Sequence, residues 1–175
     1  MLELEKTFLV ASLPHWLHTF PSKDLLDIYI PLESDHAHIR IRKHGDSMII
    51  MKKELTTPGD LSSMKESVID LDQEEFNALQ QVPGKRIHKR RYYFPWWDLT
   101  IEIDVFLDDL AGLIMADVEF PDEETKKNFQ MPDFCLCEVT QEVIFAWGLL
   151  CGKTYEDISG RLEELGYKKL SMEES

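Results

Sequence analysis

The stretch Leu2-Glu3-Leu4-Glu5-Lys6-Thr7-Phe8-Leu9-Val10 opens the chain with an alternation of leucine and glutamate and ends in apolar residues. A period of two predicts a β-strand with one buried and one polar face. Residues two apart in a strand point to the same side, so Glu3 and Glu5 stand together, roughly 6.5 Å apart. A divalent cation such as Mg²⁺ would relieve the repulsion between these carboxylates; a solvated edge strand is the alternative interpretation.

Length and composition restrict the class of protein. The 175 residues are 43% hydrophobic, which suffices for one domain with a sizeable core. The net charge of -14 argues against a binder of nucleic acid or of anionic membranes, both of which carry basic patches. No apolar run approaches the roughly 20 residues that span a bilayer, and Glu3 and Glu5 replace the basic residues of a secretory signal. We therefore expect a cytoplasmic protein.

The three cysteines are Cys135, Cys137 and Cys151. An odd number with a single Cys-x-Cys spacing favours reduced thiols in the core over a zinc site.

Seven further segments have the pattern of strands, which makes eight in all. They are Leu26 to Pro31, His36 to His44, Met48 to Leu55, Met64 to Leu71, Arg86 to Tyr93, Leu99 to Phe106 and Leu113 to Phe120. Gly45-Asp46 supplies a hairpin turn. Helices are predicted from Gln73 to about Gln81, after Asp122, from Val139 to Leu150, and from Thr154 to Gly166. This order predicts an α+β fold dominated by antiparallel sheet.

Charges of one sign gather on whole strands. Arg40 and Arg42 share one face, as do Lys89 and Arg91, and Lys53 lies on the strand that follows the Gly45 turn. The pairs Glu102 with Asp104 and Asp117 with Glu119 repeat the arrangement of Glu3 and Glu5. A barrel with these faces inward would enclose a polar lumen in which arginine and lysine hold phosphates and carboxylates hold a metal. An open sheet with solvated charges is the alternative interpretation.

The same segments resemble the CYTH superfamily, also called triphosphate tunnel metalloenzymes. The residues that carry the resemblance lie in order over about residues 1 to 150, and are Glu3 to Val10, Ile39 to Arg42, Ile87 to Tyr92, Glu102 to Phe106, Asp117 to Phe120 and Glu138 to Thr140. The resemblance implies one CYTH-like domain over residues 1–175. It also implies a closed eight-stranded antiparallel barrel, open at both ends, with helices packed outside.

By position, the resemblance implies specific roles within this tunnel. The triphosphate ligands would be Arg40, Arg42, Lys53, Lys89 and Arg91. The ligands of Mg²⁺ or Mn²⁺ would be Glu3, Glu5, Asp104, Asp117 and Glu119. Glu3 and Glu5 would also act in catalysis by positioning a water, together with Tyr29, which falls at a tunnel tyrosine or is a core aromatic.

The chain departs from the family pattern after the Val-Thr motif, where Val143, Ile144 and Phe145 replace basic residues, and at three strand positions. Thr7 replaces the last lysine of the opening motif, Asp117 stands where glutamate is usual, and Val68 replaces a second glutamate after Glu66. The predicted function is metal-dependent hydrolysis of tripolyphosphate or a small organic triphosphate. A non-catalytic binder of polyphosphate or nucleotide, favoured by Thr7, and an adenylate cyclase are the alternatives. The oligomeric state stays open, with a homodimer as one option.

Some aromatic and histidine residues are expected to have no functional role. His36 and His38 share the face of Arg40 but are expected to be exposed at a strand start. The pair Trp96-Trp97 is expected to pack between strands instead of stacking on a ligand ring. Phe145 and Trp147 are expected on an apolar helix that is buried against the outside of the barrel.

Overall fold

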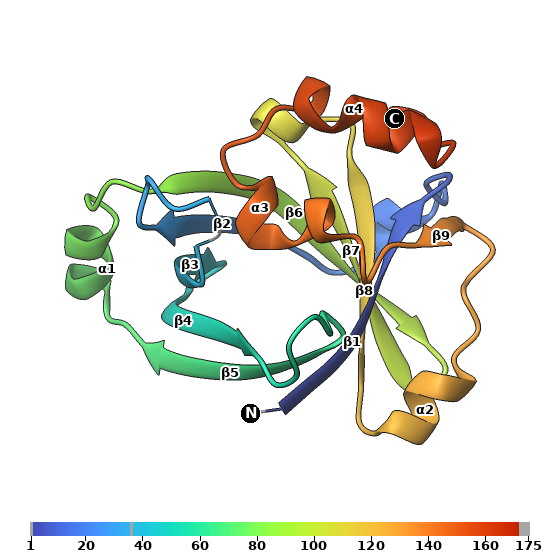
Figure 1. The fold of residues 1–175 in the computed structure, drawn as a ribbon, viewed down its shortest axis with the longest axis horizontal. Coiled ribbons are helices and arrows are strands. Elements are labelled where there is room, and N and C mark those ends of the chain that lie inside the picture. The colour runs from blue at the N-terminus through green and yellow to red at the C-terminus, as the bar shows by residue number, and fades with distance from the viewer. Residues whose placement is uncertain (1, 36, 172–175) are drawn as a thin grey trace.

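The computed structural model describes residues 2–35 and 37–171, with the backbone alone for Leu2, so His36 lies outside the described residues. Eight strands close into an antiparallel barrel in the order β1-β5-β4-β3-β2-β6-β7-β8 and back to β1 (Figure 1). The strands are β1 (Leu2–Val10), β2 (Ser22–Ile30), β3 (Ile39–His44), β4 (Ser47–Leu55), β5 (Ser63–Asp70), β6 (Lys85–Trp96), β7 (Leu99–Phe106) and β8 (Ile114–Phe120). The predicted closed barrel is confirmed.

Strand β1 closes the barrel. One edge pairs with β8 from Leu4 to Leu9, and the other edge pairs first with β5 and then, near its end, with the short β9 (Cys135–Glu138). The sequence did not predict β9, because four residues are too few to display a period of two. The pairing with β5 reaches only as far as Leu4, and β9 pairs with the same strand from Phe8 to Val10.

Short helices connect and follow the strands of the barrel wall. They are η1 (Leu17–Thr19), α1 (Gln73–Leu79), η2 (Asp108–Leu110), α2 (Glu123–Asn128), η3 (Val143–Phe145), α3 (Trp147–Leu150) and α4 (Tyr155–Glu164). Asp72 and Thr154 form the capping boxes that begin α1 and α4, as predicted. Within the described ranges, none of these helices is long and apolar enough to span a bilayer.

The predicted helix from Val139 to Leu150 is wrong. Val139 instead extends the pairing of β9 by donating its backbone N–H to the carbonyl of Thr7. The later residues form only η3 and α3, which are separated by the extended backbone of Ala146. The β-branched residues Val143 and Ile144 lower the helix propensity here, so tertiary packing decides the conformation.

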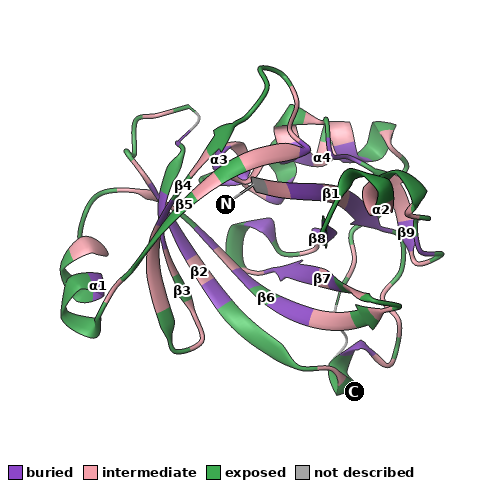
Figure 2. Ribbon diagram, turned by 90° about the horizontal axis from the view of Figure 1, so that it is seen from below, coloured by how far each residue is buried: buried purple, intermediate pink, exposed green. Residues whose placement is uncertain are grey.

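The outer face of the barrel carries two hydrophobic clusters. The larger covers β1, β7 and β8 and includes Phe8, Ile103 and Val118; Figure 2 shows buried residues along these strands. Trp96 packs at the edge of this larger cluster, with 5.9 Å between the ring centroids of Trp96 and Phe94. The packing prediction therefore holds for Trp96. It is wrong for Trp97, which is 90% exposed. In the smaller cluster, Phe76 of α1 covers Ile28 and Ile41.

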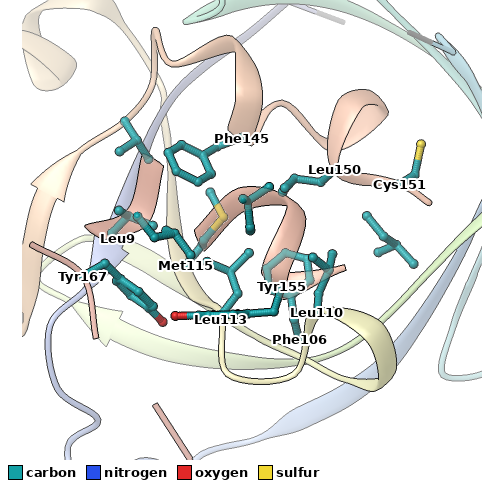
Figure 3. Close-up of a cluster of buried hydrophobic side chains, with 14 of the residues drawn as sticks. Leu9, Phe106, Leu110, Leu113, Met115, Phe145, Leu150, Cys151, Tyr155 and Tyr167 are labelled. Carbon is teal, nitrogen blue, oxygen red and sulfur yellow. The ribbon is translucent and has the colours of Figure 1, made fainter. Parts of the chain in front are cut away.

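A third cluster fills one end of the barrel. Leu9, Phe106 and Met115 occupy lumen-facing positions of β1, β7 and β8, and they pack with Phe145 and with Leu150 of α3 (Figure 3). Helix α4 contributes Tyr155, Ile158 and Leu162 to the same cluster. The resemblance implies a barrel that is open at both ends. In the described part of the chain, this hydrophobic cluster fills one of the two ends.

Phe145 and Trp147 accordingly do not lie against the outside of the barrel, and that prediction is wrong. The Trp147 ring stacks on Phe106 with 5.5 Å between the ring centroids, on the side of β7 that faces the lumen. The reason is that η3 and α3 cross the end of the barrel instead of lying along its wall, as Figure 1 shows.

Candidate active site

Strand register places oppositely charged side chains next to each other on neighbouring strands of the lumen wall. Lys53 on β4 lies opposite Glu66 on β5, and Arg91 on β6 lies opposite Asp104 on β7. The predicted acidic strands are neighbours, because Glu5 of β1 lies opposite Glu119 of β8. The ten charged residues singled out from the sequence therefore lie on the wall of one shared lumen.

Lys53 is the centre of the first charged cluster. Its Nζ lies 2.6 Å from Glu3, 3.6 Å from Glu5 and 3.7 Å from Glu66. Burial opposes the charged form of Lys53, but Glu5 and Glu3 outweigh that effect and raise its pKa. Burial together with nearby Glu3 raises the pKa of Glu66. Glu66 was noted in the sequence only as a family position, and the structure adds it to the site.

Asp104 is the centre of the second cluster and is fully buried. Arg91 donates two hydrogen bonds of 2.7 Å to its carboxylate, and Lys89 donates a third of 2.5 Å. Burial would raise the pKa of Asp104, but Arg91 and Lys89 lower it to about 2. Arg91 also pairs with Glu102, which sequence reasoning left out of the site.

Lys89 is enclosed on its remaining sides. It is 1% exposed, and its Nζ lies 3.7 Å from the centroid of the Trp147 ring. Burial lowers its pKa to about 8, although Asp104 favours the charged form. Lys89 therefore joins the end of the barrel to the charged lumen through a cation–π contact.

The third cluster lies on β2 and β3. Arg42 donates two hydrogen bonds of 2.7 Å to Asp27, a buried carboxylate that sequence reasoning missed because no charged residue lies two positions from it in the strand. Arg40 lies farther from Asp27, at 3.9 Å, and donates a hydrogen bond of 2.8 Å to the hydroxyl of Tyr29. Burial raises the pKa of Tyr29 to about 12, so its phenol stays protonated at neutral pH and orients Arg40.

Thr7 and Asp117 occupy the lumen between the first two clusters. The Thr7 hydroxyl donates a hydrogen bond of 2.8 Å to Asp117, whose other oxygen lies 3.6 Å from Arg91. Burial and the charge of Asp104 raise the pKa of Asp117 to about 7. At the more exposed Glu119, burial and then Glu102 raise the pKa. Negative charge is thus in excess where β1, β7 and β8 meet.

The donor chemistry of this region suits a hard divalent cation. Carboxylate oxygens are preferred ligands of Mg²⁺, and carboxylates that raise each other's pKa gain from a cation placed among them. Among the described side chains, no three or more carboxylate, histidine or cysteine groups are arranged to bind a metal ion. Several of the lumen carboxylates instead form ion pairs with lysine and arginine. The residue types fit the predicted metal, with Glu5, Asp117 and Glu119 contributed by neighbouring strands.

The raised pKa of Asp117 predicts a pH-dependent stability. Between about pH 4 and pH 7 the folded state keeps a proton that the unfolded chain releases, so this group contributes less stability as pH rises. We expect Asp117→Asn to remove that loss. From pH 5 to pH 8, the unfolding free energy of the variant should therefore rise relative to that of wild type by at least about 1 kcal/mol. Urea unfolding with a chelator present measures it.

The control for this experiment is Asp24→Asn, which alters an exposed carboxylate paired with Arg90. Its unfolding free energy should follow that of wild type across the same pH range, because the pKa of Asp24 is lowered mainly by its hydrogen bond from Arg90. Parallel curves for wild type and Asp117→Asn would contradict the assignment.

A pocket opens on the lumen beside β1. Glu5, Thr7, Tyr29, Arg40 and Lys53 line it, so it joins two predicted phosphate ligands to the opening strand. His38 also borders the pocket and is exposed, as predicted. A second hollow at the hairpin between β6 and β7 is lined by Glu102 and Glu119.

Comparison with known proteins places this barrel in a family. No protein-family model matches the chain. An inorganic triphosphatase from Nitrosomonas europaea is 32% identical over 145 residues, which span 81% of this chain and 91% of that protein. The chain belongs to the CYTH superfamily. A second inorganic triphosphatase, from Acetivibrio thermocellus, is 43% identical over 54 residues, or 31% of this chain and 33% of that protein.

Solved structures support the CYTH fold. The crystal structure of an inorganic triphosphatase aligns with a TM-score of 0.61 at 26% identity, over 85% of this chain and 93% of that one. A Bacillus halodurans protein described as a candidate adenylate cyclase aligns with a TM-score of 0.56 over 99% of this chain and 94% of its own. At 14% identity, the second likeness concerns the fold alone.

Proposed function

We propose that this CYTH protein is a divalent-metal-dependent triphosphatase. The observation that carries the proposal is that Arg40 and Lys53 face one pocket together with Glu5 and Thr7 of β1. Cations and carboxylates within one partly water-excluded pocket can bind a phosphate chain and its counter-ion together. The similarity to two inorganic triphosphatases supports the same class of substrate.

Charge balance favours a metal in this reaction. The carboxylates facing the lumen are Glu3, Glu5, Asp27, Glu66, Glu102, Asp104, Asp117 and Glu119, whereas the cations are Arg40, Arg42, Lys53, Lys89 and Arg91. A polyanion would enter such a lumen most favourably with its own cations. Mg²⁺ or Mn²⁺ would be held by Glu3, Glu5, Asp104, Asp117 and Glu119. A bound metal would supply charge neutralisation and an acidified water.

The residues of the chain would bind and orient the substrate. Arg40 can form a bidentate contact with phosphate oxygens, and Lys53 adds a point charge. Glu5 would orient a water in line with the terminal phosphorus. As the water oxygen bonds to phosphorus, the bridging P–O bond breaks, so tripolyphosphate gives phosphate and diphosphate while the water proton passes to solvent. Tyr29 would position Arg40 instead of accepting that proton, because its phenol stays protonated.

The test is phosphate release from tripolyphosphate, ATP and thiamine triphosphate, each with Mg²⁺, with Mn²⁺ and with excess chelator. We expect metal-dependent release from at least one substrate and none with chelator. Tight binding without release from any of them would overturn the proposal in favour of a polyphosphate or nucleotide binder. Cyclic nucleotide among the ATP products would identify a cyclase.

Thr7→Lys tests whether the missing lysine limits turnover. The ammonium would lie near Asp117 and Glu5 and add a cation for the substrate, so we expect kcat/KM for tripolyphosphate to rise about threefold to tenfold. Thr7→Met, which has similar length and no charge, is the matched control in the same steady-state assay. Equal effects of the two variants would show that charge at this position is not limiting.

A further inference from the structure

One edge of β1 has no strand partner at Glu5. In the described part of the chain, this edge pairs with β5 only as far as Leu4 and with β9 only from Phe8 onwards. The backbone N–H of Glu5 instead donates a hydrogen bond of 3.1 Å to the carbonyl of Ser62, which lies in the turn before β5. The position of Glu5 on this edge therefore depends on a turn.

Ser62 is held by side chains from two other segments. Lys126, in the last turn of α2, donates hydrogen bonds of 3.0 Å to the Ser62 carbonyl and of 2.7 Å to the Ser62 hydroxyl. Asp60 accepts bonds of 2.9 Å from the Ser62 backbone N–H and of 2.7 Å from its hydroxyl. Gln141, in the turn after β9, donates a bond of 3.0 Å to the same Asp60 oxygen and accepts one of 3.2 Å from the backbone N–H of Leu61. The turn is thus fixed from α2 and from the chain after β9.

This network restrains the Ser62 carbonyl. A carbonyl oxygen has two lone pairs, and the donors from Glu5 and Lys126 use both. Ser62 is 9% exposed, so water has limited access to replace either donor. Hydrogen bonds from Ser62 and Gln141, together with the charge of Lys126, lower the pKa of Asp60. Its carboxylate therefore stays ionised at neutral pH and keeps accepting the bonds that shape the turn.

We infer that Lys126 and Gln141 are positioning residues for Glu5. They act through Ser62, whose carbonyl fixes the backbone of β1 where Glu5 faces the lumen. This inference rests on the proposed triphosphatase function, in which Glu5 orients the attacking water. A misplacement of about 1 Å in such a group can cost about a hundredfold in rate. Loosening the turn therefore slows the chemical step and leaves substrate binding by Arg40, on β3, almost unchanged.

Steady-state kinetics test the inference with the best hydrolysed of tripolyphosphate, ATP and thiamine triphosphate. Lys126→Met keeps most of the side-chain length and removes its donors, and Lys127→Met at the exposed next position of α2 is the matched control. We expect kcat to fall about tenfold in Lys126→Met with KM within about threefold of wild type, and Lys127→Met to change neither by more than about twofold. In a Glu5→Gln background, Lys126→Met should lower kcat by less than about twofold, because the group that it positions is already lost.

A second variant and a second measurement keep folding and positioning apart. Gln141→Leu removes the other contact of the turn, and Gln73→Leu, which removes an exposed hydrogen bond in α1, is its control. Gln141→Leu should lower kcat about threefold with KM unchanged, and circular dichroism checks the folding of each variant. Amide hydrogen exchange on the metal-free protein, followed by NMR, reports on the Glu5 N–H directly. We expect this N–H to exchange at least about tenfold faster in Lys126→Met and Gln141→Leu than in wild type.

Two results would overturn the positioning role. One is an equal loss of kcat from Lys126→Met with and without Glu5→Gln, because the network would then act independently of Glu5. The other is unchanged exchange of the Glu5 N–H in both folded variants. Absence of hydrolysis of all three substrates by wild type, with faster exchange at Glu5 in the variants, would instead overturn the proposed function.

Discussion

Replacement of Arg40 by alanine is expected to lower kcat/KM for the preferred triphosphate by about a hundredfold or more, which is the size of losing one placed donor to a developing anion. Arg40 lines the pocket, and its closest oxygen partner is the neutral hydroxyl of Tyr29, at 2.8 Å. Arg42 is instead held by Asp27 through two hydrogen bonds of 2.7 Å. We therefore expect Arg42→Ala to reduce kcat/KM at least tenfold less than Arg40→Ala does.

Phosphate release under steady-state conditions measures both variants, and Arg90→Ala is the surface control. Arg90 pairs with Asp24 on the outer face, so its loss should leave kcat/KM within about twofold of wild type. Thermal unfolding of each variant separates activity from stability, because Arg42→Ala leaves the buried Asp27 with fewer partners. An equal or greater kinetic loss in folded Arg42→Ala would contradict the assignment of Arg40 as the main phosphate anchor.

The positions of the charged strands could be predicted because a period of two is a local property of the sequence. Glu5, Arg40 and Asp104 each lie two residues from a residue of like charge, so strand geometry alone puts each pair on one face. The apolar residues that alternate with these charged residues pack on the other face of each strand, and this is enough to assign the charged residues to the opposite face. Closure into a barrel then followed from the number of strands and from the resemblance to a known family.

Partners that depend on strand register could not be predicted in the same way. Asp27 and Glu66 have no residue of like charge two positions away on their strands, and their importance appears only when β3 sets Arg42 beside Asp27 and β4 sets Lys53 beside Glu66. Pairing between strands is a long-range property that the periodicity of one segment does not contain. The same holds for Trp147, whose contacts with Lys89 and Phe106 depend on where the chain crosses the barrel.

Asp104→Ala is expected to lower the free energy of unfolding by about 3–5 kcal/mol, because it removes one partner from a buried ion cluster. Asp104 is fully buried and accepts hydrogen bonds from both Arg91 and Lys89. Arg91 keeps Glu102 and Asp117 nearby, so Lys89 carries most of the loss. Urea unfolding at neutral pH, with chelator present, measures the change without a contribution from metal binding.

Two further variants identify the cause of that loss. Asp24→Ala removes an exposed carboxylate that also pairs with an arginine, and it should reduce the unfolding free energy by less than about 1 kcal/mol. The double variant Asp104→Ala with Lys89→Met should recover at least half of the stability lost, because the unpaired buried ammonium is then absent while the Met side chain still packs against Trp147. A double variant as unstable as Asp104→Ala alone would instead place the loss on Arg91. In that case the Lys89 contact with Trp147 would contribute little to holding the end of the barrel closed.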